Sequence, residues 1–321
     1  MAISINLLPA KGGDCIHIRF TDSQGPHNIV IDSGPSQNKR RFKALLEQIR
    51  RNKEQVDLLC LSHIDDDHIK GAQIILAQEE TYDRSLIKEA WINIPADNNQ
   101  SNLGTGSTYR NLSADTAQSL YNTLLRRQIT VRTEILAGNQ FTVGDALIEV
   151  LSPNQVRHDA YVEYWDSQLV KKQAGYGVDP SATNGDSIAF VLSFEGRDYL
   201  FLGDAHAPVI SDSLGDRYKT SAPVFVKLSH HGSKNNINAK LLQRMHACCF
   251  LISSEEDAER PSQETIELLE QYEPEKEKTV FCNFDCRLHA ENLDKLRIHN
   301  LQKQAVVLAD GTRLYSEGYD D

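Results

Sequence analysis

The chain has 321 residues, of which 40% are hydrophobic and 25% are charged, and its formal net charge is -11. This length suits one large α/β domain or two small ones, and the acidic balance argues against a broad nucleic-acid-binding surface. No apolar run approaches the roughly 20 residues of a membrane helix, and we expect no signal peptide. We therefore expect a cytoplasmic protein.

Short strands and amphipathic helices are predicted along the first half of the chain. Three strands separated by turns come first, followed by a basic amphipathic helix, an apolar strand and a second helix. A strand, a polar loop, a third helix and two more strands complete this half. In chain order the expected ranges are 3–8, 15–20, 28–31, 41–51, 56–61, 69–78, 90–94, 97–111, 114–127, 130–136 and 146–151.

Residues 155–186 show no clear period, and a stretch of this length without regular structure is typical of a functional lid or a disordered loop. Strands and helices then alternate up to a terminal hairpin. This alternation predicts a layered α/β sandwich. We expect one domain over residues 1–321, with a loop or lid insertion around 155–186. The ranges expected after the insertion are 187–194, 199–202, 224–228, 238–246, 249–253, 262–271, 305–309 and 312–315.

The segment Ser62-His-Ile-Asp-Asp-Asp-His68 directly follows an apolar strand, so we expect it on the loop that leaves the carboxyl end of that strand. His63, Asp65, Asp67 and His68 lie within six residues of one another. Two imidazoles and two carboxylates on one loop form a plausible binding set for one or two divalent metals. The alternative is a solvated acidic turn, with the adjacent Asp66 solvated in either case.

Three other apolar strands also end in polar side chains. They are Ile29-Val-Ile-Asp32, Leu200-Phe-Leu-Gly-Asp204 and Val226-Lys-Leu-Ser-His-His-Gly-Ser233. Because α/β proteins place ligands and catalytic groups at the carboxyl ends of their strands, we expect these side chains to meet in one site.

The order of these motifs resembles the metallo-β-lactamase superfamily, and within it the branch similar to the soluble domain of the competence protein ComEC. The resemblance implies a four-layer αββα sandwich and a metal-dependent hydrolase. It spans roughly the first three quarters of the chain. The matching segments are Gly13-Asp14, Ile31-Asp-Ser-Gly34, Ser62 to Gly71, Asn184-Gly-Asp-Ser187, Gly203-Asp204 and His230-His-Gly-Ser233.

The resemblance further implies a site for one or two metal ions and assigns a role to each residue. Asp14 and Asp32 would orient metal-bound histidines, and Asn184 lies near the position where many members carry another histidine ligand. His231 would be a catalytic helper, and Asp67 or Asp204 would accept a proton. The implied ligands are His63 and Asp65 for the first metal, Asp67, His68 and His230 for the second, and Asp204 as the bridge.

Asp65 stands where the commonest superfamily pattern has histidine, which makes the first metal position rich in oxygen. Harder ligands move the preference from zinc towards manganese. His206 could face the same cleft, although a histidine bonded to the backbone or a carboxylate is the simpler interpretation. Lys11 is interpreted as a surface lysine.

Three functions remain open from the sequence. The first is hydrolysis of a phosphodiester in nucleic acid or a nucleotide, which Lys171, Lys172 and the aromatic side chains of the lid stretch favour. The second is hydrolysis of a small carbonyl substrate such as a lactone, thioester or β-lactam. The third is a non-catalytic metal-binding module. A partner protein or a homo-oligomer is compatible with all three. The aromatic side chains of the lid stretch that favour a phosphodiester substrate are Tyr164, Trp165 and Tyr176.

Six cysteines in a chain of this length do not form a disulfide scaffold. Cys282, Cys286 and His289 match no common zinc spacing, so we interpret the two cysteines as buried or partly buried thiols.

Overall fold

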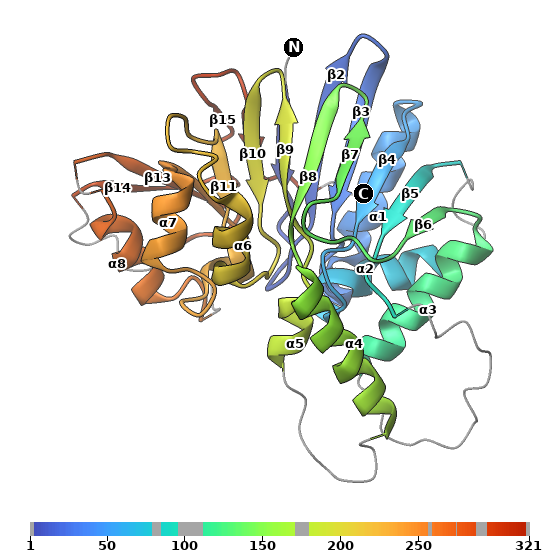
Figure 1. The fold of residues 1–321 in the computed structure, drawn as a ribbon. Helices are drawn as coiled ribbons and strands as arrows, with labels where there is room; N and C mark the ends of the chain where they lie inside the picture. Colours follow the sequence, from blue (N-terminus) through green and yellow to red (C-terminus); the bar gives the residue numbers. More distant parts are fainter. Residues whose placement is uncertain are drawn as a thin grey trace.

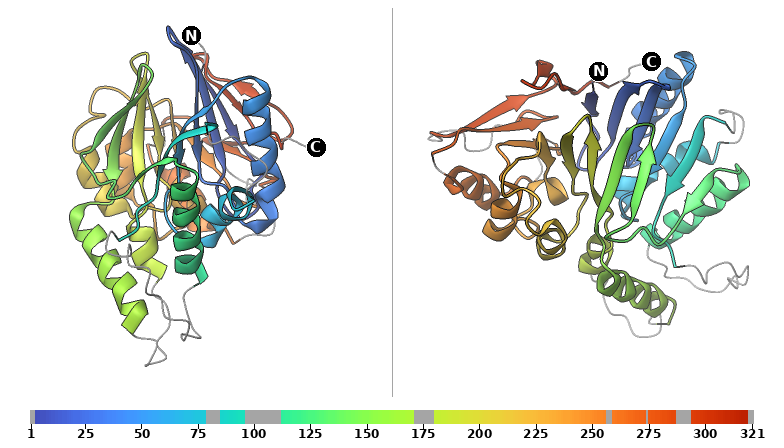
Figure 2. Two further views of the ribbon diagram at one scale, coloured as in Figure 1. Left: turned by 90° about the vertical axis from the view of Figure 1, so that its right-hand side faces the viewer. Right: turned by 45° about the horizontal axis from the view of Figure 1, so that its top comes forward.

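The computed structural model describes residues 3–78, 85–95, 112–170, 180–255, 259–273, 275–286 and 294–318. Two eight-stranded sheets face each other, and helices cover their outer faces (Figure 1). Figure 2 shows the same layers from two other sides. This is the four-layer αββα sandwich that the sequence predicted.

The first sheet has the strand order β15-β16-β1-β2-β3-β4-β5-β6. β1, β2 and β3 pair antiparallel, whereas β3 to β6 pair parallel. Helices α1, α2 and α3 pack on its outer face. The strands of this sheet and the helices on its outer face are β1 (Ser4–Leu7), β2 (Ile16–Asp22), β3 (Gly25–Ile31), α1 (Lys39–Arg51), β4 (Val56–Cys60), α2 (Asp66–Leu76), β5 (Ile87–Trp91), α3 (Leu112–Arg126), β6 (Thr130–Arg132), β15 (Val306–Val307) and β16 (Arg313–Tyr315).

The second sheet has the order β14-β13-β12-β11-β10-β9-β8-β7, with α6, α7 and α8 on its outer face. Among the described residues, no helix is long and apolar enough to cross a membrane. The bounds are β7 (Gln140–Val143), β8 (Ala146–Ser152), β9 (Ala189–Phe194), β10 (Arg197–Phe201), α6 (Ala207–Leu214), β11 (Phe225–Lys227), α7 (Ala239–Met245), β12 (Cys249–Ile252), α8 (Gln263–Gln271), β13 (Lys278–Cys282) and β14 (Leu296–Asn300).

Three hydrophobic layers hold the sandwich together, one between the sheets and one under each set of helices. The central strands serve two layers at once because their side chains alternate between the faces of the sheet. On β3, Ile29 and Ile31 point between the sheets, whereas Val30 packs under the helices. On β10, Tyr199 points between the sheets and Leu200 outwards.

The stretch expected to lack regular structure contains two helices, α4 (Gln155–Val170) and α5 (Pro180–Gly185). The expectation was wrong because Tyr161 and Trp165 are spaced four residues apart, as on one helix face. Both side chains are buried in the core beside α2 and α3, so they are not available to stack on a substrate. Lys171, Lys172 and Tyr176 lie outside the described residues.

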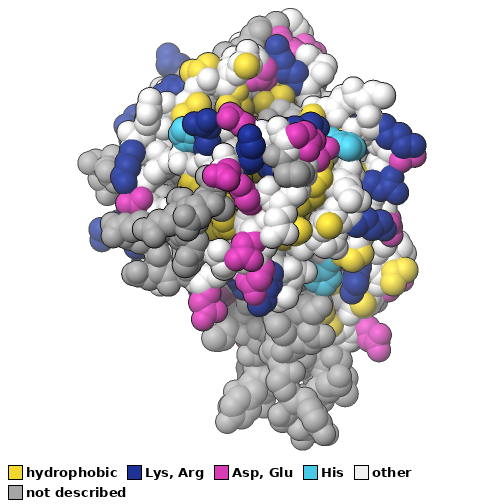
Figure 3. All heavy atoms as spheres, turned by 90° about the vertical axis from the view of Figure 1, so that its left-hand side faces the viewer, with side chains coloured by type: hydrophobic (Ala, Val, Ile, Leu, Met, Phe, Trp, Pro, Cys, Tyr) yellow, Lys and Arg dark blue, Asp and Glu magenta, His cyan; other side chains and the backbone are white. Residues whose placement is uncertain are grey.

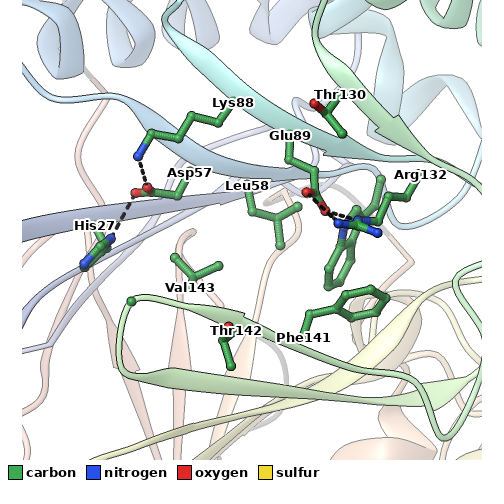
Figure 4. A pocket seen from close by; sticks show the side chains of 12 residues that line it. His27, Asp57, Leu58, Lys88, Glu89, Thr130, Arg132, Phe141, Thr142 and Val143 are labelled. Atoms are coloured by element: carbon green, nitrogen blue, oxygen red, sulfur yellow. Dashed lines mark hydrogen bonds and ion pairs between the residues drawn. The ribbon is translucent and has the colours of Figure 1, made fainter.

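The two sheets end at β6 and β7, and a cavity of about 640 Å³ opens between these edges (Figure 4). It lies towards the amino ends of β3 and β4. Its basic side chains are paired: Lys88 Nζ lies 2.6 Å from Asp57, and Arg132 Nε lies 2.6 Å from Glu89. These pairs are half-exposed, and such pairs contribute little to stability.

The described cysteines are free thiols. Cys282 is buried on β13, and its contact with Cys286 and its burial raise its thiol pKa. This agrees with the interpretation of these residues as thiols, while His289 lies outside the described residues.

Candidate metal centre

Four strands deliver polar side chains to one edge of the sandwich. Asp32 follows β3, His63 follows β4, Asp204 follows β10, and His230 and His231 follow β11. Within each sheet the strands concerned run parallel, β3 beside β4 and β10 beside β11. Their carboxyl ends therefore meet, and the structure brings together the residues that the sequence placed at strand ends.

Asp204 lies at the centre of the cluster and is 2% exposed. Its Oδ2 atom lies 3.7 Å from His63 Nε2, 3.6 Å from His68 Nε2 and 3.5 Å from His230 Nε2. Three sets of three described side chains bring their ligand atoms within 4.8 Å of one another. They are His63, His68 and Asp204; Asp67, His68 and His231; and Asp14, Asp32 and His68.

Hydrogen bonds fix the orientation of His68 and His231. His68 Nδ1 lies 2.8 Å from Asp32 Oδ2, and His231 Nδ1 lies 2.8 Å from the Ser253 carbonyl oxygen. An ionised carboxylate and a carbonyl oxygen only accept hydrogen bonds, so each Nδ1 carries the donated proton. In the neutral imidazoles, both Nε2 atoms then present a lone pair to the cluster.

His63 is held in the same way through Ser62. The Ser62 hydroxyl donates to Asp32 Oδ2 over 2.7 Å, so its oxygen is left to accept from His63 Nδ1 at 3.1 Å. Asp32 also accepts the Ser62 amide N–H. The role expected for Asp32, as a carboxylate that orients histidines, matches these contacts.

His230 is oriented by Asn236, which the sequence analysis missed. Asn236 Nδ2 donates to the Asp204 carbonyl oxygen over 2.9 Å, so its Oδ1 faces His230 Nδ1 at 3.0 Å. Asn184 Nδ2 lies 3.4 Å from the same Nδ1 atom, and Asn184 Oδ1 is buried without a hydrogen-bond partner.

Several buried polar atoms in the cluster lack hydrogen-bond partners. They are the Nε2 atoms of His63, His68 and His231 and the Oδ1 atom of Asp204. Each unpaired buried polar atom costs about 1–3 kcal/mol. Imidazole nitrogens and carboxylate oxygens that converge in this way fit a divalent cation, which would satisfy all of them.

The electrostatics of the cluster favour positive charge. Burial opposes the charge on His68, but Asp204, Asp67 and Asp32 outweigh it and raise the pKa well above its usual value. For His231, burial is likewise outweighed, chiefly by Asp14, and the pKa rises to about 9. Protons and a metal cation therefore compete for the same nitrogen atoms.

Asp67 and His68 lie in the first turn of α2, which begins at Asp66. The sequence placed them on a loop and began the helix at residue 69, which is wrong by one turn. Carboxylates are favoured there because the amino end of a helix is electropositive. The turn packs closely on Gly13, where an added Cβ would overlap the Asp67 carbonyl oxygen. Asp66 pairs with Lys70 and belongs to none of the three ligand sets.

A buried ion pair lies behind His231. Lys227 Nζ lies 2.6 Å from Asp14 Oδ2, and Asp14 Oδ1 lies 3.5 Å from His231 Nδ1. Both Lys227 and Asp14 are 1% exposed. The sequence assigned Asp14 to the surroundings of the metal but missed Lys227, although a lysine inside an apolar strand was a usable signal.

The backbone separates the roles of the two adjacent histidines. His230 and His231 both adopt positive φ, 49° and 56°, a conformation that costs free energy in non-glycine residues and is typical of functional sites. This turn places His231, 1% exposed, with Asp67 and His68. His230 lines the pocket above the cluster instead. The sequence-based assignment, with His230 as a ligand and His231 as a catalytic helper, remains a prediction, because His230 Nε2 also lies 3.5 Å from Asp204 Oδ2.

Asp65 lies on the other side of the cluster, with Oδ2 3.6 Å from His63 Nε2. Thr183 donates a hydrogen bond to this oxygen over 3.3 Å. Lys11, by contrast, is exposed, as expected of a surface lysine.

A pocket of about 690 Å³ opens above the cluster. It brings His206 to the same cleft, as the sequence had left open, and adds two arginines that the sequence analysis did not consider. The lining residues are Asp65, Asp67, Arg157, Asn184, His206, Pro208, His230, Asn235, Asn236 and Arg260.

Sequence comparisons show which proteins this chain resembles. The model of the metallo-β-lactamase superfamily matches residues 13–80, which include Gly13-Asp14 and the segment from Ser62 to Gly71. ComE operon protein 3 of Bacillus subtilis (strain 168) is 20% identical over 284 residues. The match covers 84% of this chain and 30% of that protein, so the chain spans less than a third of its relative's length.

Solved structures also align with this chain. The metallo-β-lactamase fold protein YhfI from Bacillus subtilis is 11% identical with a TM-score of 0.47, over 87% of this chain and 95% of that one. A diphosphatase from the PhnP family is 10% identical with a TM-score of 0.40, over 89% and 81%. The family model and the sequence relative confirm the predicted superfamily and its ComEC-like branch.

Proposed function

Because this chain has the metallo-β-lactamase fold and the motifs of its ComEC-like branch, we propose that it is a divalent-metal-dependent hydrolase that cleaves phosphodiesters. One observation carries the proposal. The unpartnered Nε2 atoms of three buried histidines converge with Asp204 beneath a pocket that contains two arginines. The cluster supplies metal ligands, and the arginines suit an anionic substrate.

In the proposed centre, Asp67, His68 and His231 would hold one cation, His63 and Asp65 would hold the other, and Asp204 could serve either. When bound, a divalent cation would lower the pKa of water and polarise a phosphoryl oxygen. Asp32, Ser62 and the Ser253 carbonyl fix the histidine tautomers for this purpose.

His230 is proposed as the proton acceptor. It lines the pocket, and Asn236 holds its Nδ1 proton so that the Nε2 lone pair points towards Asp204. A base oriented by a third group is the usual arrangement in hydrolysis. The nearby Asp204 carboxylate would stabilise the imidazolium, which then returns the proton to the leaving oxygen. This assignment exchanges the roles that the sequence gave to His230 and His231.

The test compares two adjacent variants for metal content and turnover. His231→Ala should lose about one equivalent of metal. His230→Ala should keep its metal and lose about 10²–10⁴-fold in turnover of bis(p-nitrophenyl) phosphate, the usual contribution of a general base. Metal loss in His230→Ala together with full metal content in His231→Ala would restore the roles expected from the sequence.

The substrate class is tested with the same metal-loaded protein. It should hydrolyse bis(p-nitrophenyl) phosphate faster than a panel of lactones, thioesters and β-lactams. Turnover of the carbonyl panel alone would replace the phosphodiester proposal with the small-carbonyl alternative. Metal binding without turnover of either panel would favour a non-catalytic module.

A further inference from the structure

Two arginine side chains stand on the wall of the pocket above the metal centre. Arg157 belongs to α4, and Arg260 precedes α8. A Cβ added to Gly185 would lie 3.6 Å from Arg157 Cδ and 3.4 Å from His206 Cε1, so Arg157 stands close to His206. Arg260 is near enough to His230 to act on its charge. The two cations therefore reach the pocket from different elements.

Neither guanidinium forms an ion pair or hydrogen bond with another side chain in the part of the chain that the structure describes. Elsewhere arginines pair with carboxylates, as Arg19 does with Glu54 and Arg132 with Glu89. The net charge of -11 makes carboxylates plentiful. Two unpaired, partly buried arginines in one pocket therefore point to an anionic ligand.

We propose that Arg157 and Arg260 bind phosphate groups that flank the scissile one, so that the substrate is a nucleic-acid strand held by its backbone. This inference rests on the proposed phosphodiesterase function. Metal ions in the centre would neutralise the scissile phosphate. The two arginines are therefore left to bind the charges of neighbouring phosphate groups. The planar guanidinium donates paired hydrogen bonds to phosphate oxygens, which a neutral acyl substrate does not offer.

The rest of the pocket favours recognition of the backbone over the bases. Its described lining contains Pro208, His206 and asparagines, and no Phe, Tyr or Trp ring on which a base could stack. On the side of the molecule shown in Figure 3, described Lys and Arg side chains are interspersed with Asp and Glu. Phosphates are thus gathered at the pocket, and cleavage does not depend on base sequence.

The experiment measures kcat/KM for two substrates: bis(p-nitrophenyl) phosphate, and dithymidine phosphate with a further phosphate at both ends. Dividing the kcat/KM for the dinucleotide by that for bis(p-nitrophenyl) phosphate removes the effect of any general damage to the metal centre, which would lower both values. Arg157→Ala and Arg260→Ala should each lower this ratio about tenfold to a hundredfold, the usual effect of losing a charged hydrogen bond. Arg157→Lys should lower it less. Arg132→Ala, in the distant cavity, is the matched control and should leave the ratio unchanged.

Binding is measured separately with the same bisphosphorylated dinucleotide carrying an uncharged, uncleavable methylphosphonate linkage. The affinity for this ligand should fall about tenfold to a hundredfold for each arginine removed. Unchanged ratios and affinities in both alanine variants overturn the inference while leaving the phosphodiesterase proposal intact. Tighter binding of thymidine triphosphate than of the dinucleotide overturns the assignment to a strand. If wild type cleaves no phosphodiester, both proposals fail.

Discussion

Replacing Lys227 with methionine tests whether the ion pair behind the metal centre supports the fold. Lys227 Nζ contacts Asp14 Oδ2 at 2.6 Å and donates to the Leu228 carbonyl oxygen at 3.1 Å. Both charged side chains are 1% exposed, so Lys227→Met leaves the buried Asp14 carboxylate with His231, 3.5 Å away, as its remaining basic partner. Breaking such a pair costs about 3–5 kcal/mol. We expect that loss in the free energy of unfolding, a large share of the roughly 5–15 kcal/mol of a typical domain.

The assay is urea unfolding at pH 7 in the presence of a chelator, so that metal binding does not contribute. Lys234→Met is the matched control, because Lys234 pairs with Glu264 and both side chains are 56% exposed. Its cost should stay below about 1 kcal/mol. The double variant Asp14→Asn with Lys227→Met should recover much of the loss. Equal costs for the two single lysine variants would refute the reasoning.

Two further changes test the packing and the charges of the fold. Gly13→Ala should fold but lose metal affinity by about 10–100-fold, measured by calorimetry, because the added methyl group displaces the Asp67 carbonyl and with it the first turn of α2. Asp198→Asn should destabilise the protein at pH 7 but not at acid pH. Burial alone would raise the pKa of Asp198, but contacts with Arg217, Ser193 and Tyr218 outweigh burial and lower this pKa. This stabilisation is present above the unfolded pKa of about 4 and is lost as pH falls, so urea unfolding of variant and wild type should converge at low pH.

The sequence predicted those parts of the site that depend on strand ends. An apolar run that stops at an aspartate or histidine shows where a strand leaves the core, and Asp32, His63 and Asp204 were found in this way. The sheet layers followed from the same runs. These signals are local, because each is carried by about five consecutive residues.

Other parts depend on contacts between distant segments and were missed. Asn236 orients His230 only because a loop returns six residues later, and Arg157 reaches the pocket only because α4 packs beside α5. The different surroundings of His230 and His231 depend on two positive φ angles, which the sequence analysis did not predict. The helix α4 was missed for a different reason, since its aromatic residues were interpreted as substrate contacts.

The oxygen-rich side of the metal centre leads to a last prediction, on metal choice. Beside His63 Nε2 lie carboxylate oxygens of Asp65 and Asp204. Oxygen ligands favour manganese over zinc more than imidazoles do. We therefore expect wild type to prefer Mn²⁺ at this position. Asp65→His should shift the ratio of the Zn²⁺ and Mn²⁺ dissociation constants towards zinc by at least about tenfold.

The neighbouring carboxylate supplies the control for this change. Asp66 is 40% exposed and pairs with Lys70, so Asp66→His adds an imidazole to the same turn without facing His63. Calorimetric titration of each metal into the chelator-treated proteins measures the ratio without relying on turnover. A shift of the same size in both variants would mean that an added histidine acts through general affinity for zinc. Unchanged ratios in both would mean that Asp65 does not contact the metal, and the first position would then have to be built from His63, Asp204 and His230.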